Sequence, residues 1–290
     1  MNMESRTDMT AFGHQLLTPA EVLTDAQLAA VIQAVFVSVL SACGVPEERA
    51  KCLFEKSRSL AGYAEATELE EAIRDLLLPL IDMQALRESL DARAALITEQ
   101  IAPYVSGGSI LDIGCGDGLV SLGLAKSVGA VQLVDICNYR DSRVSLPFLL
   151  VSESDPLPFQ ESQFETSMLL TVLHHANDPL GLLRDAIRVT ERRLIIIESV
   201  FGFGTSRSSK RSPFGTLTCE QQRKYAVVVD WIYNRLLHYN VPVPYNFFVP
   251  VGWKQLLTLA GLSVVAMVDL GVDQPLVPEY HVLYIADKTG

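Results

Sequence analysis

The chain has 290 residues, a formal net charge of -11 and 49% apolar residues. This length suits one large domain or one domain with an appendage, and the apolar content excludes a globally disordered chain. The acidic balance disfavours a nucleic-acid surface, because such a surface needs a basic stripe along the phosphates.

The cysteines indicate the redox environment. Their number is odd and no two stand in C-x-x-C spacing, which favours reduced thiols over a disulfide framework or a zinc site (Cys43, Cys52, Cys115, Cys137 and Cys219). No charged and then apolar leader opens the chain, so we expect a cytoplasmic protein. The sequence indicates no metal site.

The first part of the chain is predicted to be helical. The first ~12 residues are polar and expected to be loose. The stretch 18–104 then shows helical periodicity, with Thr18 or Thr24 as the first cap. No catalytic constellation occurs in this stretch. We predict that residues 1–105 form an all-helical region that serves as a lid or as the contact of a homodimer.

One segment of this region could be mistaken for a membrane span. The run from Leu28 to Val45 is nearly free of charge and reaches the short limit for crossing a bilayer. Its strongly apolar residues recur with a period of 3.6, and polar residues lie off that stripe. The pattern favours a buried helix or a dimer-contact helix, and we expect no interaction with a membrane.

From residue 106 onward, strands and helices alternate. The alternation predicts a doubly wound, mostly parallel α/β sheet over residues 106–290. The last two strands follow each other without room for a crossover helix, which predicts an antiparallel pair at the sheet edge. The predicted strands are 109–113, 131–135, 148–151, 166–170, 194–198, 262–268 and 281–285, with a helix at 179–189.

The most informative stretch is 110–118, which reads ILDIGCGDG and leads into a predicted helix. A strand, a tight glycine turn and a helix bring bare backbone within reach of a bound nucleotide. A dinucleotide-binding turn would place its third glycine at position 119, where this chain has Leu119. This departure disfavours an NAD-linked oxidoreductase. The stretch instead resembles the first motif of class I methyltransferases, which use S-adenosylmethionine (SAM).

The resemblance implies a fold and a cofactor. The implied fold is a Rossmann-like seven-stranded sheet with an antiparallel edge strand, and the implied product is S-adenosylhomocysteine (SAH). SAM carries two positive groups and no phosphate, so an acid at the strand end is useful. We expect Asp112 to hold its amino-acid part, with Gly114, Cys115, Gly116 and Asp117 forming the turn beside it.

Two later segments are predicted to contact the adenosyl group. Asp135, followed by Ile136, closes an apolar strand and could accept hydrogen bonds from both ribose hydroxyls, unless it is only a solvated strand-end acid. Residues 152–159, SESDPLPF, are similar to the family segment G-D-A-x-x-L-P-F. That similarity implies an adenine contact for Glu153, a backbone N–H from Ser154 facing the ring, and an apolar wall (Leu157, Pro158 and Phe159, after Asp155).

A histidine pair follows the fourth predicted strand. Residues 171–179, TVLHHANDP, resemble type 11 methyltransferases, and Thr171 is expected at the cofactor. His174 matches the position of a general base in plant-type small-molecule O-methyltransferases, with His175 as a second candidate. The alternative is that the histidines only pack or orient the loop.

Two segments depart from the family pattern. Residues 137–147 are too few for a full crossover helix, so a single turn or a loop is expected. Residues 201–250 are an insertion with a basic stretch at 206–212 and a predicted helix at 219–238. Such an insertion is typical of a lid or substrate pocket. Side chains that could shape an acceptor pocket, or only pack a lid, are Tyr233, His238, Tyr239, Tyr245, Phe247, Phe248, Glu279, Tyr280 and His281, with Tyr245 the catalytic candidate.

The predicted function is SAM-dependent methyl transfer to the oxygen, nitrogen or carbon nucleophile of a small-molecule acceptor. Nucleic-acid substrates are disfavoured, because the chain lacks the N/D-P-P-Y/F string after the fourth strand and a Pro-Cys nucleophile. The alternative is a non-catalytic SAM-binding subunit or pseudo-enzyme that acts through a protein partner.

Overall fold

The computed structural model describes residues 17–105, 108–202, 213–237, 241–272 and 276–289. The first ~12 residues, expected to be loose on composition alone, the basic stretch 206–212, and both His238 and Tyr239 lie outside these ranges.

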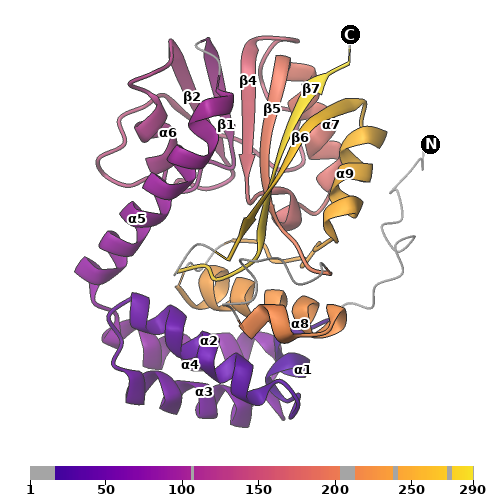
Figure 1. Ribbon diagram of the computed structural model, residues 1–290. Helices are drawn as coiled ribbons and strands as arrows, with labels where there is room; N and C mark the ends of the chain where they lie inside the picture. Colours follow the sequence, from indigo (N-terminus) through magenta and orange to yellow (C-terminus); the bar gives the residue numbers. More distant parts are fainter. Residues whose placement is uncertain (1–16, 106–107, 203–212, 238–240, 273–275, 290) are drawn as a thin grey trace, which may run out of the picture.

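The N-terminal region is helical, as predicted. A bundle of four helices is followed by the long helix α5, which runs from the bundle to the sheet (Figure 1). Thr18 caps the first helix, because its side chain accepts from the Glu21 N–H while Glu21 bonds back to the Thr18 N–H. The helices are α1 (Pro19–Leu23), α2 (Ala29–Ala42), α3 (Glu47–Ala61), α4 (Ala66–Leu77) and α5 (Met83–Ile101), with short 3-10 turns η2 (Leu78–Leu80) and η3 (Ala102–Tyr104).

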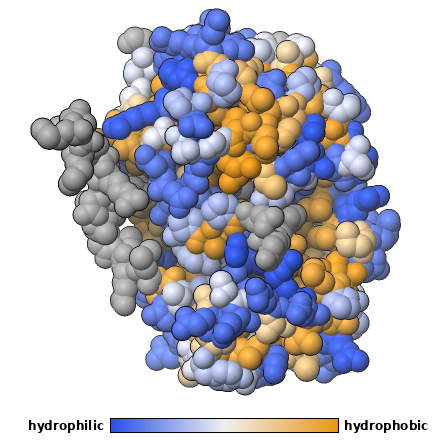
Figure 2. Space-filling view, turned by 180° about the vertical axis from the view of Figure 1, so that it is seen from behind, coloured by the Kyte–Doolittle hydropathy of each residue, from blue (hydrophilic) through white to orange (hydrophobic). Residues whose placement is uncertain are grey.

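The uncharged segment forms α2, and its apolar stripe is buried within the chain. Ile32, Phe36 and Val39 are among its fully covered side chains, and the helix packs against α3, α5 and α8. The buried helix is therefore the correct one of the two alternatives. Among the described residues, no helix is long and apolar enough to cross a membrane. Hydrophilic side chains spread over both halves of the rear face, with apolar patches between them (Figure 2).

The second part of the chain forms the predicted seven-stranded sheet. The strand order is β3-β2-β1-β4-β5-β7-β6; the first five strands pair in parallel, and β7 runs antiparallel between β5 and β6. The predicted antiparallel pair thus closes one edge, with β6 outermost. The strands are β1 (Ser109–Ile113), β2 (Ala130–Asp135), β3 (Phe148–Leu150), β4 (Phe164–Leu170), β5 (Thr190–Ser199), β6 (Leu262–Gly271) and β7 (His281–Lys288).

Helices cover both faces of the sheet. Apolar residues of α5 and α6 (Leu119–Leu124) pack on one face, and those of α7 (Pro179–Val189) and α9 (Pro250–Leu259) on the other. The residues 137–147 contain no helix, so a loop replaces the crossover. The short turn η4 (Leu173–His175) follows β4, and η6 (Pro213–Thr216) precedes α8.

The insertion supplies the helix that joins the two parts. α8 (Cys219–Trp231) begins at a capping box made by Thr218 and continues as a π-helix, η7 (Ile232–Leu237). It contacts α1 and α2, and it lies between the helical bundle and the carboxyl ends of the parallel strands (Figure 1). Ligands of doubly wound folds bind at that edge of the sheet.

Candidate functional site

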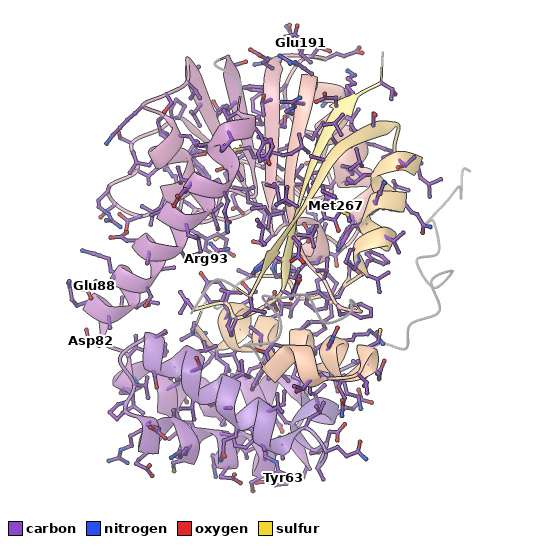
Figure 3. The ribbon with its side chains drawn as sticks, in the orientation of Figure 1. Tyr63, Asp82, Glu88, Arg93, Glu191 and Met267 are labelled. Atoms are coloured by element: carbon purple, nitrogen blue, oxygen red, sulfur yellow. The ribbon has the colours of Figure 1, made fainter. Side chains whose placement is uncertain are left out.

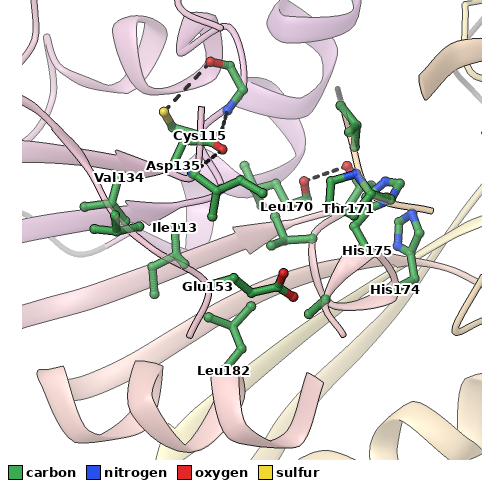
Figure 4. Close-up of a pocket in the computed structure, with 18 of the residues that line it drawn as sticks. Ile113, Cys115, Val134, Asp135, Glu153, Leu170, Thr171, His174, His175 and Leu182 are labelled. Atoms are coloured by element: carbon green, nitrogen blue, oxygen red, sulfur yellow. Dashed lines mark hydrogen bonds between the residues drawn. The ribbon is translucent and has the colours of Figure 1, made fainter. Parts of the chain in front are cut away.

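One large cavity of about 1050 Å³ lies at the carboxyl edge of the sheet. Its walls come from the turns after β1, β2, β3 and β4, from α8, and from the loop before β7. In Figure 4, Cys115 and Asp135 lie at one end of the pocket and His174 and His175 at the other. The structure therefore brings the predicted cofactor motifs and the predicted catalytic histidines to one site.

The turn after β1 has a left-handed backbone conformation, which glycine adopts more easily than other residues. Gly114, Gly116 and Gly118 all have left-handed φ angles, of 69°, 53° and 72°. A Cβ on Gly114 would come within 2.7 Å of the Val172 side chain, whereas one on Gly116 would meet nothing within 4 Å. Because Gly116 lines the cavity, the room beside it is available to a ligand. This turn fits a cofactor that passes close to the main chain.

Two acids sit beside the turn. Asp112 is 2% exposed, and Ser121 Oγ donates to its Oδ2 over 2.6 Å. Burial raises the pKa of Asp112 to about 7 and also raises the pKa of Asp117. A cationic group in the cavity would return Asp112 to its charged form, so this end of the cavity suits the amino group of an amino acid.

Asp135 closes β2 against the same turn. Its Oδ2 accepts from the Gly116 N–H over 2.9 Å and its Oδ1 from the Ile136 N–H over 2.7 Å. Oδ1 also accepts from the Cys137 N–H over 3.4 Å, so Oδ2 is the oxygen with a second lone pair left for a ribose hydroxyl. Ile136 lines the cavity and is 40% exposed, so it offers an apolar face to the adenine ring of a cofactor.

The loop after β3 brings Glu153 to the cavity. Its two oxygens accept from the backbone N–H of Asn177 (2.7 Å) and from the Asn177 side-chain Nδ2 (2.8 Å). Ser154 and Asp155 also line the cavity, but the Ser154 N–H donates to Ser152 Oγ. Sequence reasoning missed Asn177, which anchors the residue expected at the adenine.

The histidine end holds a buried chain of polar contacts. His174 Nδ1 lies 2.6 Å from Glu198 Oε2, and Glu198 Oε1 accepts from the backbone N–H groups of Val172 and Leu173. Burial is the largest effect and lowers the pKa of His174, but the charge and hydrogen bond of Glu198 together with the charges of Asp230 and Glu279 outweigh it and raise the pKa to about 9. His174 therefore holds a proton at neutral pH in this arrangement, which is unfavourable for a general base.

His175 differs from His174 in its protonation. Its Nδ1 lies 2.8 Å from the Pro242 carbonyl oxygen, so this nitrogen carries the hydrogen and Nε2 keeps its lone pair. Burial, together with the neighbouring His174, lowers the pKa of His175 well below its usual value. The two ring centroids are 4.0 Å apart, and Phe247 stacks on His174 at 5.2 Å.

Two further acids line this end of the cavity. Asp230 of α8 and Glu279 before β7 are each 2% exposed, and burial raises their pKa values to about 6 and about 8. Asn234 Nδ2 donates to Asp230 Oδ1 over 2.6 Å, and Ser199 Oγ donates to Glu279. The sequence interpretation named Glu279 and placed Glu198 at the end of a strand without a role at the site. It missed Asp230 and Asn234, because no local motif surrounds them.

The N-terminal region also contributes to the cavity. Arg93 on α5 lines it and donates to Thr171 Oγ1 over 3.4 Å; Figure 3 shows Arg93 on the side of α5 that faces the sheet. Thr171 has a left-handed φ of 61°, a conformation that costs a residue with a side chain of order 1–3 kcal/mol. The helical region therefore contributes Arg93 and Ile97 of α5 to the cavity lining, while its role as a lid or a dimer contact stays a prediction.

The aromatic residues of the insertion are only partly at the site. Tyr233 lines the cavity, but Tyr245, the third catalytic candidate, does not, and its neighbour Asn246 instead bonds to the loop of His174. Phe248 packs edge-on against Trp253. Tyr280 donates to Asp269, and His281 is buried on β7 away from the cavity lining. Most of these residues therefore pack around the site and do not line the cavity.

Strand order and site together define the class of protein. A doubly wound sheet whose β1 ends in a glycine turn and whose β2 ends in an acid is a Rossmann-like cofactor-binding domain. The acids at the turn and the residue Leu119 suit SAM better than a dinucleotide.

Comparison with known proteins finds methyltransferases that part of the chain resembles. Residues 111–196 match the family model of a methyltransferase domain. Over 92 residues the chain is 26% identical to the ubiquinone biosynthesis O-methyltransferase of Hydrogenovibrio crunogenus, a match that spans 29% of this chain and 38% of that protein. The segment 111–196 is thus similar to a methyltransferase domain, which supports SAM as the cofactor.

Solved structures with a similar fold include two methyltransferases. A SAM-dependent methyltransferase from Aquifex aeolicus is 16% identical with a TM-score of 0.45, over 69% of this chain and 98% of that one. The magnesium protoporphyrin IX methyltransferase of Synechocystis PCC 6803, solved with bound SAH, is 14% identical with a TM-score of 0.45, over 72% and 89%.

Proposed function

We propose that this protein transfers a methyl group from SAM to a small-molecule acceptor. The observation that carries this proposal is a single cavity lined by both the cofactor turn and the buried His174–Glu198 cluster. When bound, SAM supplies an electrophilic methyl group. The acceptor would occupy the histidine end of the cavity, because the motifs that match the cofactor occupy the other end.

The chain's own contribution is placement and exclusion of water. Asp112, Asp135 and Glu153 would hold the amino-acid, ribose and adenine parts of the cofactor. Arg93 and Tyr233 close the cavity from the helical side. Holding two reacting groups in contact in a closed site accounts for a large part of such rate enhancements.

The low pKa of His175 keeps the lone pair of its Nε2 free of a proton at neutral pH, although it also makes the ring a weaker base, whereas His174 is already protonated. We therefore favour His175 over His174 as the group that receives the acceptor's proton. The acidic balance of the chain favours a small molecule over a nucleic acid. The O-methyltransferase name of the matched relative supports an oxygen nucleophile.

The test is acceptor-dependent formation of SAH. The purified chain would be incubated with methyl-labelled SAM and a panel of hydroxylated small molecules, and SAH and labelled products would be measured by mass spectrometry. We expect one class of acceptor to gain the label, and Asp135→Ala to abolish both signals. A protein that binds SAH, turns over no acceptor and forms a stable complex with another chain would instead be a non-catalytic SAM-binding subunit.

A further inference from the structure

We propose that His174, His175 and Asp230 form a binding site for one divalent transition-metal ion at the histidine end of the cavity. One ligand atom from each residue can be chosen so that all three lie within 4.8 Å of one another. Asp230 Oδ1 lies 3.8 Å from His174 Nε2 and 3.5 Å from His175 Nε2. Ligands at ~2.0–2.2 Å from a tetrahedral Zn²⁺ lie roughly 3.3–3.5 Å apart, so small side-chain shifts suffice.

Both imidazoles are oriented as metal ligands are. A histidine that binds a metal through one nitrogen almost always donates its other N–H to a carboxylate or a backbone carbonyl. His174 meets the Glu198 carboxylate through Nδ1, and His175 meets the Pro242 carbonyl through Nδ1. Both Nε2 atoms are thereby directed at the same carboxylate, that of Asp230.

Buried carboxylate oxygens beside the imidazoles provide an independent observation. Asp230 Oδ2 and Glu279 Oε1 are buried and have no hydrogen-bond partner among the described residues. Both residues line the cavity, and their charges act on His174. A buried carboxylate oxygen without a donor is costly unless a proton or a cation satisfies it. An ion bound by the two imidazoles would supply that charge.

The ligand types indicate the class of ion. Two imidazoles and one carboxylate suit Zn²⁺, Fe²⁺ or Co²⁺, whereas Mg²⁺ and Ca²⁺ prefer sites made of oxygen atoms. Three protein ligands also leave positions open toward the cavity, which an oxygen of a small molecule could occupy. The alternative is a metal-free cluster held by hydrogen bonds, in which the Asn234 amide donates to Asp230. Metal binding does not depend on the methyl transfer proposed above, but a bound ion would occupy the His175 Nε2 lone pair, so His175 could not then also receive the acceptor's proton.

In the test, the chelator-treated chain is titrated with Co²⁺ alone and monitored by visible absorption, and it is titrated separately with Zn²⁺ alone and monitored by calorimetry. We expect one ion per chain, and visible Co²⁺ bands without the charge-transfer absorption of thiolate ligands. Asp230→Asn and His175→Gln should each weaken binding by more than about tenfold, and Glu198→Gln by roughly 10–100-fold, as for other partners of ligating histidines. Cys52→Ser and Cys219→Ser, which remove two exposed thiols, should leave the metal affinity and the Co²⁺ spectrum unchanged.

The metal site would be overturned if the wild-type chain bound no metal or if its Co²⁺ spectrum showed thiolate charge-transfer bands. It would also be overturned if Asp230→Asn and His175→Gln bound metal as tightly as the wild type. Thermal unfolding confirms that each variant is folded, and the wild-type spectrum tests the site without any substitution. Each sample is also titrated with SAH. Retained SAH binding without metal binding would reject this site alone, while metal binding without SAH binding would reject only the proposed function.

Discussion

At the scale of single residues, Gly116 offers the sharpest test of where the cofactor lies. A Cβ at Gly116 would enter the cavity without touching the protein, so Gly116→Ala should lower SAH affinity at least tenfold. Gly261, in the turn before β6, is the matched control: it also has a positive φ and open space, but it does not line the cavity. Both variants should lose roughly 1–2 kcal/mol of stability. Equal SAH affinity in the two would place the ligand elsewhere.

Asp112 makes stability depend on pH. Burial raises its pKa to about 7 in the folded protein, above the ~3.9 of an unfolded chain. Between these values the folded protein keeps a proton that the unfolded chain has released. The contribution of Asp112 to the free energy of unfolding therefore decreases as the pH rises from about 4 to 7. Urea unfolding at several pH values measures this: the free energy of unfolding of Asp112→Asn should decrease less between pH 4 and 7 than that of the wild type.

The same titration should govern cofactor binding. An ammonium group binds the ionised carboxylate, so SAH affinity should rise between pH 6 and 8, by up to about tenfold, because a group one pH unit below its pKa is only a tenth ionised. Ser121→Ala removes the hydroxyl that favours the charged form and should move the midpoint to higher pH. Calorimetry at each pH measures this; an unchanged pH profile in Asp112→Asn would contradict the role of Asp112.

At the scale of elements, the contact of α4 with α8 and η7 holds the helical region over the site. Glu70 accepts from Trp231 Nε1 and from Arg235, and its side chain is 14% exposed. Glu70→Ala removes the acceptor of the buried Trp231 Nε1 and the ion-pair partner of Arg235, and should cost ~1.5–3 kcal/mol. Glu71→Ala, an exposed position on the same helix, should stay within about 0.5 kcal/mol of the wild type. Urea denaturation compares the two; equal losses would show that this contact contributes little.

Elements differ in how well the sequence predicts them. The glycine turn, the acid after β2 and the capping Thr18 follow from local patterns, and the structure places each as expected. β5 begins earlier than predicted, at Thr190, because pairing with β4 extends the strand through polar residues that hydropathy alone does not assign. The π-helix after α8 has no sequence pattern that would distinguish it from an α-helix.

At the scale of the whole molecule, the site is a product of tertiary assembly. The cavity lining runs from Arg93 on α5 to Glu279 before β7, so residues far apart in the chain meet there. The sequence predicted the half of the cavity that is lined by the glycine turn and the acid after β2, because these motifs are continuous in the chain. It could not pair Asp230 with His174 and His175, because docking of α8 under the sheet edge is decided by long-range packing.

The measurement that tests the central claim most directly is a calorimetric titration of the wild-type chain with SAH and, separately, with NAD⁺. The account predicts one SAH per chain at micromolar affinity, weakened by both Asp112→Ala and Asp135→Ala, and no NAD⁺ binding, because Leu119 replaces the third glycine of a dinucleotide turn. Binding of NAD⁺ by a folded chain that does not bind SAH would contradict it.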